Sequence, residues 1–156
     1  MQRGQRLSKD NFLVIQADLQ LTPNTLLPAQ QFIIGGGQSV RGFRQNARSG
    51  DNGFRFSIED RITIWRKLEK PKIQLAPFID LGVVWNESGN PNELLDEQFL
   101  LGAGLGFRWN DFLSIDGFNF RLDYGIPFVD LNNPDHNIQD DGLYFQVNFQ
   151  PVGAKR

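Results

Sequence analysis

Apolar and polar residues alternate along six segments of the chain: residues 11–21, 53–65, 73–85, 98–109, 117–126 and 142–149. In the third segment, Ile79, Leu81 and Val83 share one parity, and Asp80 and Gly82 lie on the other. Because successive side chains of a strand point to opposite faces, this alternation predicts strands with one apolar and one polar face. No segment of comparable length has a helical period. The sequence therefore predicts an all-β protein of about six strands.

The placement of charge supports these strands. Eight charged residues of the six segments fall on the polar parity: Asp18, Arg55, Glu59, Arg61, Asp80, Arg108, Arg121 and Asp123. Asp60 falls on the apolar parity, and we expect a β-bulge near it to turn its side chain to the polar face. Trp85 and Trp109 end their segments on the apolar parity, as an interfacial aromatic belt requires, whereas Trp65 ends on the polar parity.

The connections between the segments alternate in length. The turns at 66–72 and 110–116 are short, and residues 22–52, 86–97 and 127–141 form long loops. Short turns at one end and long loops at the other are typical of an antiparallel transmembrane β-barrel. Six strands do not close around a lumen, so we expect an open sheet that is part of a larger barrel. A soluble β-sandwich with the apolar face inside is the alternative, because parity does not identify the inner face.

Composition excludes several other classes of function. The chain has 156 residues, a net charge of −2 and no cysteine, so neither a nucleic-acid-binding surface nor a thiol site is indicated. His136 is the single histidine, and no metal site can be built around it. The glycines at 102, 104 and 106 lack the strand–turn–helix setting of a nucleotide loop. No spacing suggests a nucleophile or paired catalytic carboxylates, so we expect no enzyme and no cofactor.

The stretch FIIGGGQSVRGFRQNARSGDNGFRFSIED, residues 32–60, resembles the loop-six region of two-partner secretion transporters. PFIDLG (77–82) resembles the F-x-D-x-G strand motif of their superfamily, the outer-membrane protein-85 proteins. GAGLGFRW (102–109), NFRLDYGIPF (119–128) and LYFQVNF (143–149) resemble the strands that follow, up to the last strand. The resemblance covers essentially the whole chain and is to the haemolysin and filamentous-haemagglutinin secretion-activation family.

The resemblance implies that residues 1–156 are the C-terminal part of a sixteen-stranded surface-antigen barrel, with loop six at 22–52. Periplasmic POTRA domains would precede it. The implied function is export of a large unfolded partner protein through the outer membrane without nucleotide. The implied partners are that protein, outer-membrane lipid and, during insertion, the barrel-assembly machinery. A barrel-assembly factor of the same superfamily is the runner-up.

The resemblance also implies a site in the loop-six motif Val40-Arg41-Gly42-Phe43. In the family this tip folds back into the barrel lumen. A guanidinium inside a barrel needs a carboxylate partner. Asp80 is the first candidate, and Glu59 and Asp123 share its parity and are the alternatives. Gly42 would allow a tight turn, and Phe43 would anchor the tip against the barrel wall.

Overall fold

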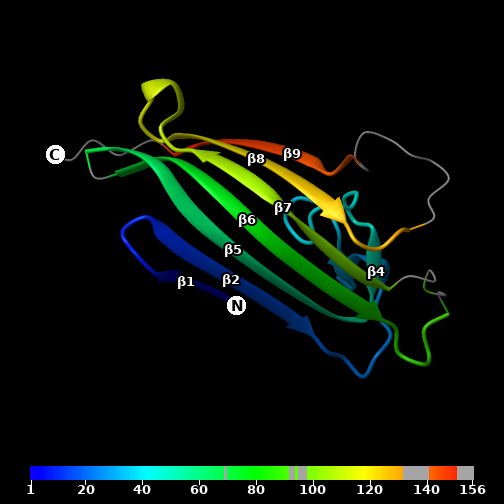
Figure 1. The fold of residues 1–156 in the computed structure, drawn as a ribbon. Coiled ribbons are helices and arrows are strands. Elements are labelled where there is room, and N and C mark those ends of the chain that lie inside the picture. Colours follow the sequence, from blue (N-terminus) through cyan, green and yellow to red (C-terminus); the bar gives the residue numbers. More distant parts are fainter. Residues whose placement is uncertain (69, 92–93, 95–97, 132–140, 151–156) are drawn as a thin grey trace.

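The fold is described by a computed structural model over residues 1–68, 70–91, 94, 98–131 and 141–150. Seven strands form one antiparallel sheet (Figure 1). They are β1 (Gln2–Arg6), β2 (Asn11–Gln20), β5 (Asn52–Lys67), β6 (Lys70–Trp85), β7 (Phe99–Trp109), β8 (Phe118–Pro127) and β9 (Leu143–Phe149). The strands are accompanied by two short 3₁₀ turns, η1 (Pro28–Gln30) and η2 (Phe112–Ser114). None of the helices in this part of the chain is long and apolar enough to cross a membrane.

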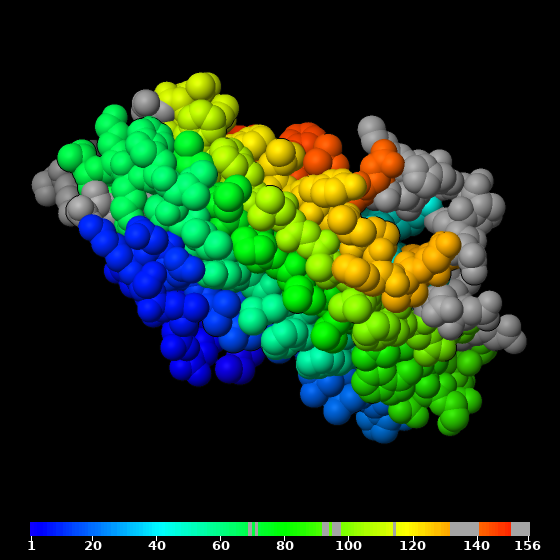
Figure 2. All heavy atoms as spheres, viewed as in Figure 1, coloured from blue at the N-terminus to red at the C-terminus, as the bar shows by residue number. Residues whose placement is uncertain are grey.

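The strands lie in the order β1-β2-β5-β6-β7-β8-β9, so every neighbour in the sheet is the next long strand along the chain. The residues between β2 and β5, 21–51, form loop six. It carries its own hairpin of β3 (Phe32–Ile34) and β4 (Arg48–Gly50), and it packs on one face of the sheet. We call this face the inner face. Seen from the other side with all atoms drawn, the sheet covers most of the loop (Figure 2).

Burial in this sheet is the reverse of burial in a soluble β-sandwich. Side chains of the apolar parity are exposed on the outer face, and Ile79 and Phe145 are 51% and 76% exposed. Charged residues of the polar parity are buried beneath loop six, where Asp80 is 0% and Asp123 1% exposed. The apolar parity therefore points away from the interior, as in a barrel that faces lipid. The expectation of an antiparallel barrel portion is confirmed, and the alternative of a sandwich with an apolar interior is wrong.

The sheet has one strand more than the six that alternation predicts. The additional strand β1 has the sequence QRGQR, and all of its residues are exposed. It pairs with β2 along its whole length, from Gln2 opposite Gln16 to Arg6 opposite Phe12. A strand without apolar residues leaves no period-two signal, because that signal is the alternation of apolar with polar residues.

The expectation of a β-bulge at Asp60 is also wrong. The pairing of β5 with β6 keeps the same register from Glu59 to Thr63, and the irregularity lies between Thr63 and Arg66. Asp60 accepts a hydrogen bond from the Asn11 side chain at 3.2 Å instead. The bulge changes the parity of Trp65, which pairs with Ile73 and therefore shares the outer face with Trp109, the partner of Ile73 on β7.

Candidate functional site

Arg41, at the tip of loop six, lies buried against the middle of the sheet with 4% of its surface exposed. Its guanidinium binds the Asp80 carboxylate of β6 with two parallel hydrogen bonds, Nε–Oδ2 at 2.6 Å and Nη2–Oδ1 at 2.8 Å. The Arg41 backbone N–H donates to the same Oδ2 at 3.1 Å, and the Ser57 hydroxyl donates to Oδ1 at 2.6 Å. Asp80 thus accepts four hydrogen bonds, so its buried charge is well compensated.

The alternative partners Glu59 and Asp123 are also in the site. Glu59 Oε2 of β5 lies 2.7 Å from Arg41 Nη1, and Asp123 Oδ2 of β8 lies 3.5 Å from the same nitrogen. Arg108 of β7 joins these two carboxylates, because its Nη2 lies 2.8 Å from Glu59 and its Nη1 contacts Asp123. All three candidate carboxylates therefore lie at Arg41, and the predicted role of its partner is shared among them.

Two further arginines complete this ion cluster. Arg61 binds Glu59 at 2.8 Å, and Arg121 donates from Nε to Asp123 at 2.6 Å. The cluster thus consists of four guanidinium groups and three carboxylates: Arg41, Arg61, Arg108 and Arg121 with Glu59, Asp80 and Asp123. Burial alone would lower the pKa of Arg41, but Asp80 and Glu59 raise it above its ordinary value. The tip consequently carries a permanent positive charge.

The F-x-D-x-G motif places three contacts with loop six on one face of β6. The Phe78 ring lies under the Arg41 guanidinium in a cation–π arrangement, with Arg41 Cζ 3.4 Å from the centroid of the ring. Asp80 supplies the paired carboxylate. Gly82 faces Val40 and Ile34, which lie 3.0 and 3.1 Å from the position that a Cβ atom would occupy. Phe78 is the first residue of this motif, but its contact with Arg41 was not predicted, although its position on the polar parity of a strand was a signal.

Glycines of the neighbouring strands β7 and β8 also lie directly under the tip. A Cβ atom added to Gly102 of β7 would collide with the Arg41 carbonyl, and one added to Gly125 of β8 would lie 2.6 Å from the Gly42 nitrogen. The backbone of the tip therefore lies directly on the backbone of the sheet. The close approach of the tip accounts for Gly102, which lacks the setting of a nucleotide loop.

The other three residues of the tip motif hold its shape. Gly42 has a φ of 102°, a conformation that favours glycine. Val40 is 0% and Phe43 3% exposed. Both pack in a small apolar cluster of Ile34, Val40, Phe43, Ala47, Val84 and Leu100. This cluster joins loop six to β6 and β7, so the tip is held by packing as well as by charge.

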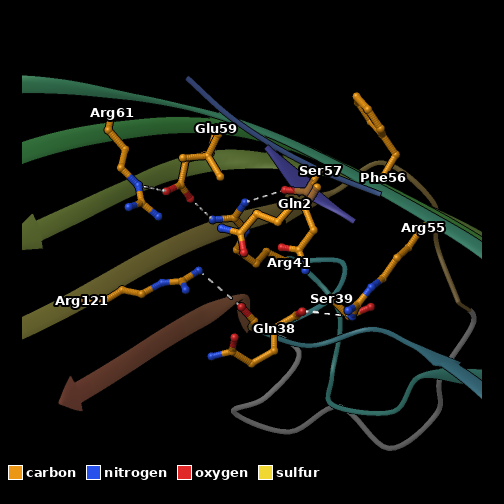
Figure 3. A pocket seen from close by; sticks show the side chains of 13 residues that line it. Gln2, Gln38, Ser39, Arg41, Arg55, Phe56, Ser57, Glu59, Arg61 and Arg121 are labelled. Carbon is orange, nitrogen blue, oxygen red and sulfur yellow. Dashed lines mark hydrogen bonds and ion pairs between the residues drawn. The ribbon is translucent and has the colours of Figure 1, made fainter. Parts of the chain in front are cut away.

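A polar cavity of about 270 Å³ opens beside the ion cluster (Figure 3). Arg41, Glu59 and Arg61 lie along one side of it, and Gln38, Arg55 and Arg121 are among the other lining residues. The Arg55 guanidinium binds Asp18 at 2.7 Å and donates to the carbonyl of Gln38 at 3.2 Å. Arginines of the sheet and polar atoms of loop six thus share the polar lining of this cavity.

At the base of loop six, Asp51 connects the loop to the next long loop. Its buried carboxylate accepts hydrogen bonds from the backbone N–H groups of Leu26 and Glu87 and from the side chains of Gln31 and Asn90, all within 3.3 Å. Burial alone would raise the pKa of Asp51, but these donors hold it below its ordinary value. Asp51 belongs to the GDNG stretch of the loop-six resemblance, and its role as a hydrogen-bond acceptor was not predicted.

Nothing in the described part of the chain resembles a metal centre, since no three His, Cys, Asp or Glu residues converge there. His136 lies outside the described residues.

The sheet order, the outward apolar face and the inward ion cluster define part of an outer-membrane-type β-barrel. A family model for the haemolysin secretion/activation proteins ShlB/FhaC/HecB matches residues 5–109. The chain belongs to this family. It is similar to a solved structure of CdiB from Acinetobacter baumannii, with 26% identity over 95% of this chain and a TM-score of 0.65. The chain spans 25% of that protein's length. No curated protein matches it.

These comparisons confirm the resemblance to two-partner secretion transporters. The family is one of secretion and activation proteins and not an enzyme class.

Proposed function

We propose that the full-length protein is an outer-membrane pore that exports a large unfolded partner protein of haemolysin or haemagglutinin type to the cell surface. Membership of the secretion/activation family supports export. The inner face, with its arginines and carboxylates, suits a wet channel through which an extended polypeptide passes. Because no nucleotide-binding loop is present in the sequence, we propose export without nucleotide. The outer face would contact outer-membrane lipid, and the barrel-assembly machinery would insert the protein.

The observation that carries this proposal is the way in which loop six is held. One side chain, Arg41, joins the tip to carboxylates of three strands: Glu59 of β5, Asp80 of β6 and Asp123 of β8. A loop whose tip is anchored by a buried charged group can exist in a held and a released state. We propose that the held state occupies the channel and is the conduction-ready position of the loop: release of the Arg41 contacts clears the channel for the exported chain, but a loop that is never held does not start export.

The test compares the full-length protein with its Arg41→Ala variant in planar lipid bilayers and in a secretion assay. We expect the variant to insert normally, to open more often or for longer, and to secrete at most one tenth as much partner protein. A tenfold loss corresponds to about 1.4 kcal/mol, which is well within the effect of breaking a buried ion pair. Arg3→Ala is the control, because Arg3 is exposed on β1. Unchanged conductance and secretion in the Arg41 variant would contradict the proposal.

The family match favours secretion over the runner-up, a barrel-assembly factor. The two functions differ in what fails when the protein is removed. Loss of one exported protein, with other outer-membrane barrels inserted normally, is expected for a secretion pore. General loss of outer-membrane barrels is the result expected of an assembly factor.

A further inference from the structure

The tip of loop six has a second attachment that does not involve the ion cluster. We propose that Tyr144 of β9 is a positioning residue that couples the tip of loop six to the last strand of this sheet. The functional consequence rests on the proposed export function, but the contacts and the first measurement below do not. Tyr144 lies in the quoted last-strand stretch LYFQVNF, but no contact with loop six was predicted for it, although it is an aromatic residue on the polar parity of its strand.

The hydroxyl of Tyr144 bridges two successive residues of the tip. It accepts a hydrogen bond from the Gly42 N–H at 3.0 Å and donates one to the Phe43 carbonyl at 2.6 Å. Both tip residues are buried, with Phe43 only 3% exposed. Buried backbone groups need hydrogen-bond partners, so the hydroxyl has a specific role at this point.

Two other contacts bring the same strand against loop six. The Tyr144 ring lies against Gly37, where an added Cβ atom would be 3.0 Å from the ring. Two residues further along the same face of β9, the Gln146 side chain accepts a hydrogen bond from the Gln38 side chain at 3.1 Å. The contact is therefore a small surface of β9 and not a single hydroxyl that happens to be near the loop.

The position of β9 in the sheet determines which strands the attachment connects to the tip. Among the described strands, β9 is the last of the sheet and pairs with β8 alone, with Tyr144 opposite Asp123. The carboxylates that bind Arg41 come from β5, β6 and β8. The tip is thus held by charge on the central strands and by a neutral hydroxyl on the edge strand. Displacement of β9 relative to β8 would move Tyr144 and weaken the hold on the tip.

The first test is hydrogen–deuterium exchange of the full-length protein in detergent micelles, followed by mass spectrometry of peptides that cover residues 37–46. We expect Tyr144→Phe, which keeps the ring and removes the hydroxyl, to speed exchange of these peptides about tenfold, because the Gly42 N–H loses its acceptor. Tyr124→Phe is the matched control, since Tyr124 lies on β8 and is 51% exposed on the outer face. Equal exchange in wild type and Tyr144→Phe would overturn the proposal.

A second measurement separates positioning from general stability. In planar bilayers we expect Tyr144→Phe to raise the opening frequency about tenfold, and to have no further effect in a protein that already carries Arg41→Ala, because its tip is already released. An effect of the same size in both backgrounds, or faster exchange spread evenly over β8 and β9, would show a purely structural role and overturn the proposal. If the wild-type protein neither conducts nor secretes, the proposed export function fails, while the exchange experiment still decides the role of Tyr144.

A disulfide variant provides the opposite perturbation and does not depend on the folding of Tyr144→Phe. Gln38→Cys combined with Gln146→Cys places two thiols where the side chains now touch. We expect the oxidised protein to open at least tenfold less often than the same protein after reduction. If oxidised and reduced forms open equally often, then attachment of the loop to β9 does not control the tip, and the proposal is wrong.

Discussion

At the residue scale, Arg41 shows how a buried charge can fix position without adding much net stability. A guanidinium offers five donors in a fixed plane, and Arg41 uses three nitrogens and its backbone N–H on Asp80, Glu59 and Ser57. Desolvation offsets much of the attraction in such pairs, but removing one partner leaves a buried charge uncompensated, which costs about 3–5 kcal/mol. The cluster therefore specifies where the tip lies more than it stabilises the sheet.

Gly102 gives a prediction at the same scale. Gly102→Ala would place a methyl group against the Arg41 carbonyl, so the tip must move away from β7. We expect a loss of about 1–3 kcal/mol in the free energy of unfolding, together with faster hydrogen exchange of loop six. Denaturant unfolding of the full-length protein in detergent measures the free energy of unfolding, and mass spectrometry measures the hydrogen exchange of loop six.

Gly89→Ala is the control for this prediction. The nearest atom to an added Cβ there is the Thr25 methyl group at 3.5 Å, an ordinary contact. Equal stability of Gly102→Ala, Gly89→Ala and wild type would mean that the tip does not rest on β7 as described.

At the scale of elements, loop six is attached at both its tip and its base. Asp51 joins the segment around Leu26 and the hairpin start at Gln31 to the loop at Glu87 and Asn90. All of these donors are neutral, so the attachment depends on the ionised carboxylate accepting from them. The loops at this end of the sheet are therefore expected to move together.

The lowered pKa of Asp51 predicts how this attachment responds to acid. A carboxyl group whose pKa is lowered by folding stabilises the folded state at pH values above its ordinary pKa of 3.8. This stabilisation is lost as the pH falls through the lower pKa of the folded state. A spin label on Leu27→Cys, whose native side chain is 70% exposed, should become mobile only below pH 3.8. In Asp51→Asn it should be mobile at neutral pH.

Asp116→Asn, an exposed carboxylate at the opposite end of the sheet, is the control and should leave the label unchanged. A label that is equally mobile at neutral pH in the wild-type protein and in Asp51→Asn would contradict the role of Asp51.

The elements that the sequence predicted are those whose signal is side-chain alternation. All six alternating segments are strands in the structure, with ends shifted by a few residues. β1 could not be found because it buries no side chain, and β3 and β4 are only three residues each. The bulge before Arg66 depends on how β5 pairs with β6, which no single strand sequence records. The tip motif was found by resemblance, whereas the partners Phe78 and Tyr144 depend on where the loop comes to rest.

At the scale of the whole molecule, the sheet exposes apolar residues outward and ends in two edges, β1 and β9. The outer face carries aromatic residues near the end of the sheet that has short turns. Trp109 lies near Phe107 and Phe112 there, and Trp65 lies on the same face. Trp85 ends β6 at the opposite end, which has long loops. Such a spacing places tryptophan at both interfaces of a bilayer.

This arrangement predicts depth-dependent quenching of tryptophan fluorescence in lipid vesicles. We expect quenchers near the headgroups to reduce the emission of these three tryptophans at least twice as much as quenchers at the bilayer centre. The measurement compares wild type with Trp65→Phe and Trp109→Phe, so that the emission of any other tryptophan cancels. Loss of the interfacial component in each variant supports the assignment, and equal quenching at all depths in both would contradict it.

The ion cluster also restricts how the strands can slide past one another. Asp80, Glu59 and Asp123 lie on three different strands, and all of them reach the inner face in the present register. A slip of one residue reverses the side to which every side chain of a strand points. Such a slip would turn a carboxylate into hydrocarbon and an isoleucine or leucine into the wet interior. The charges that hold loop six therefore also select the strand register during assembly. They favour the present pairing of these strands over pairings that are shifted by one residue.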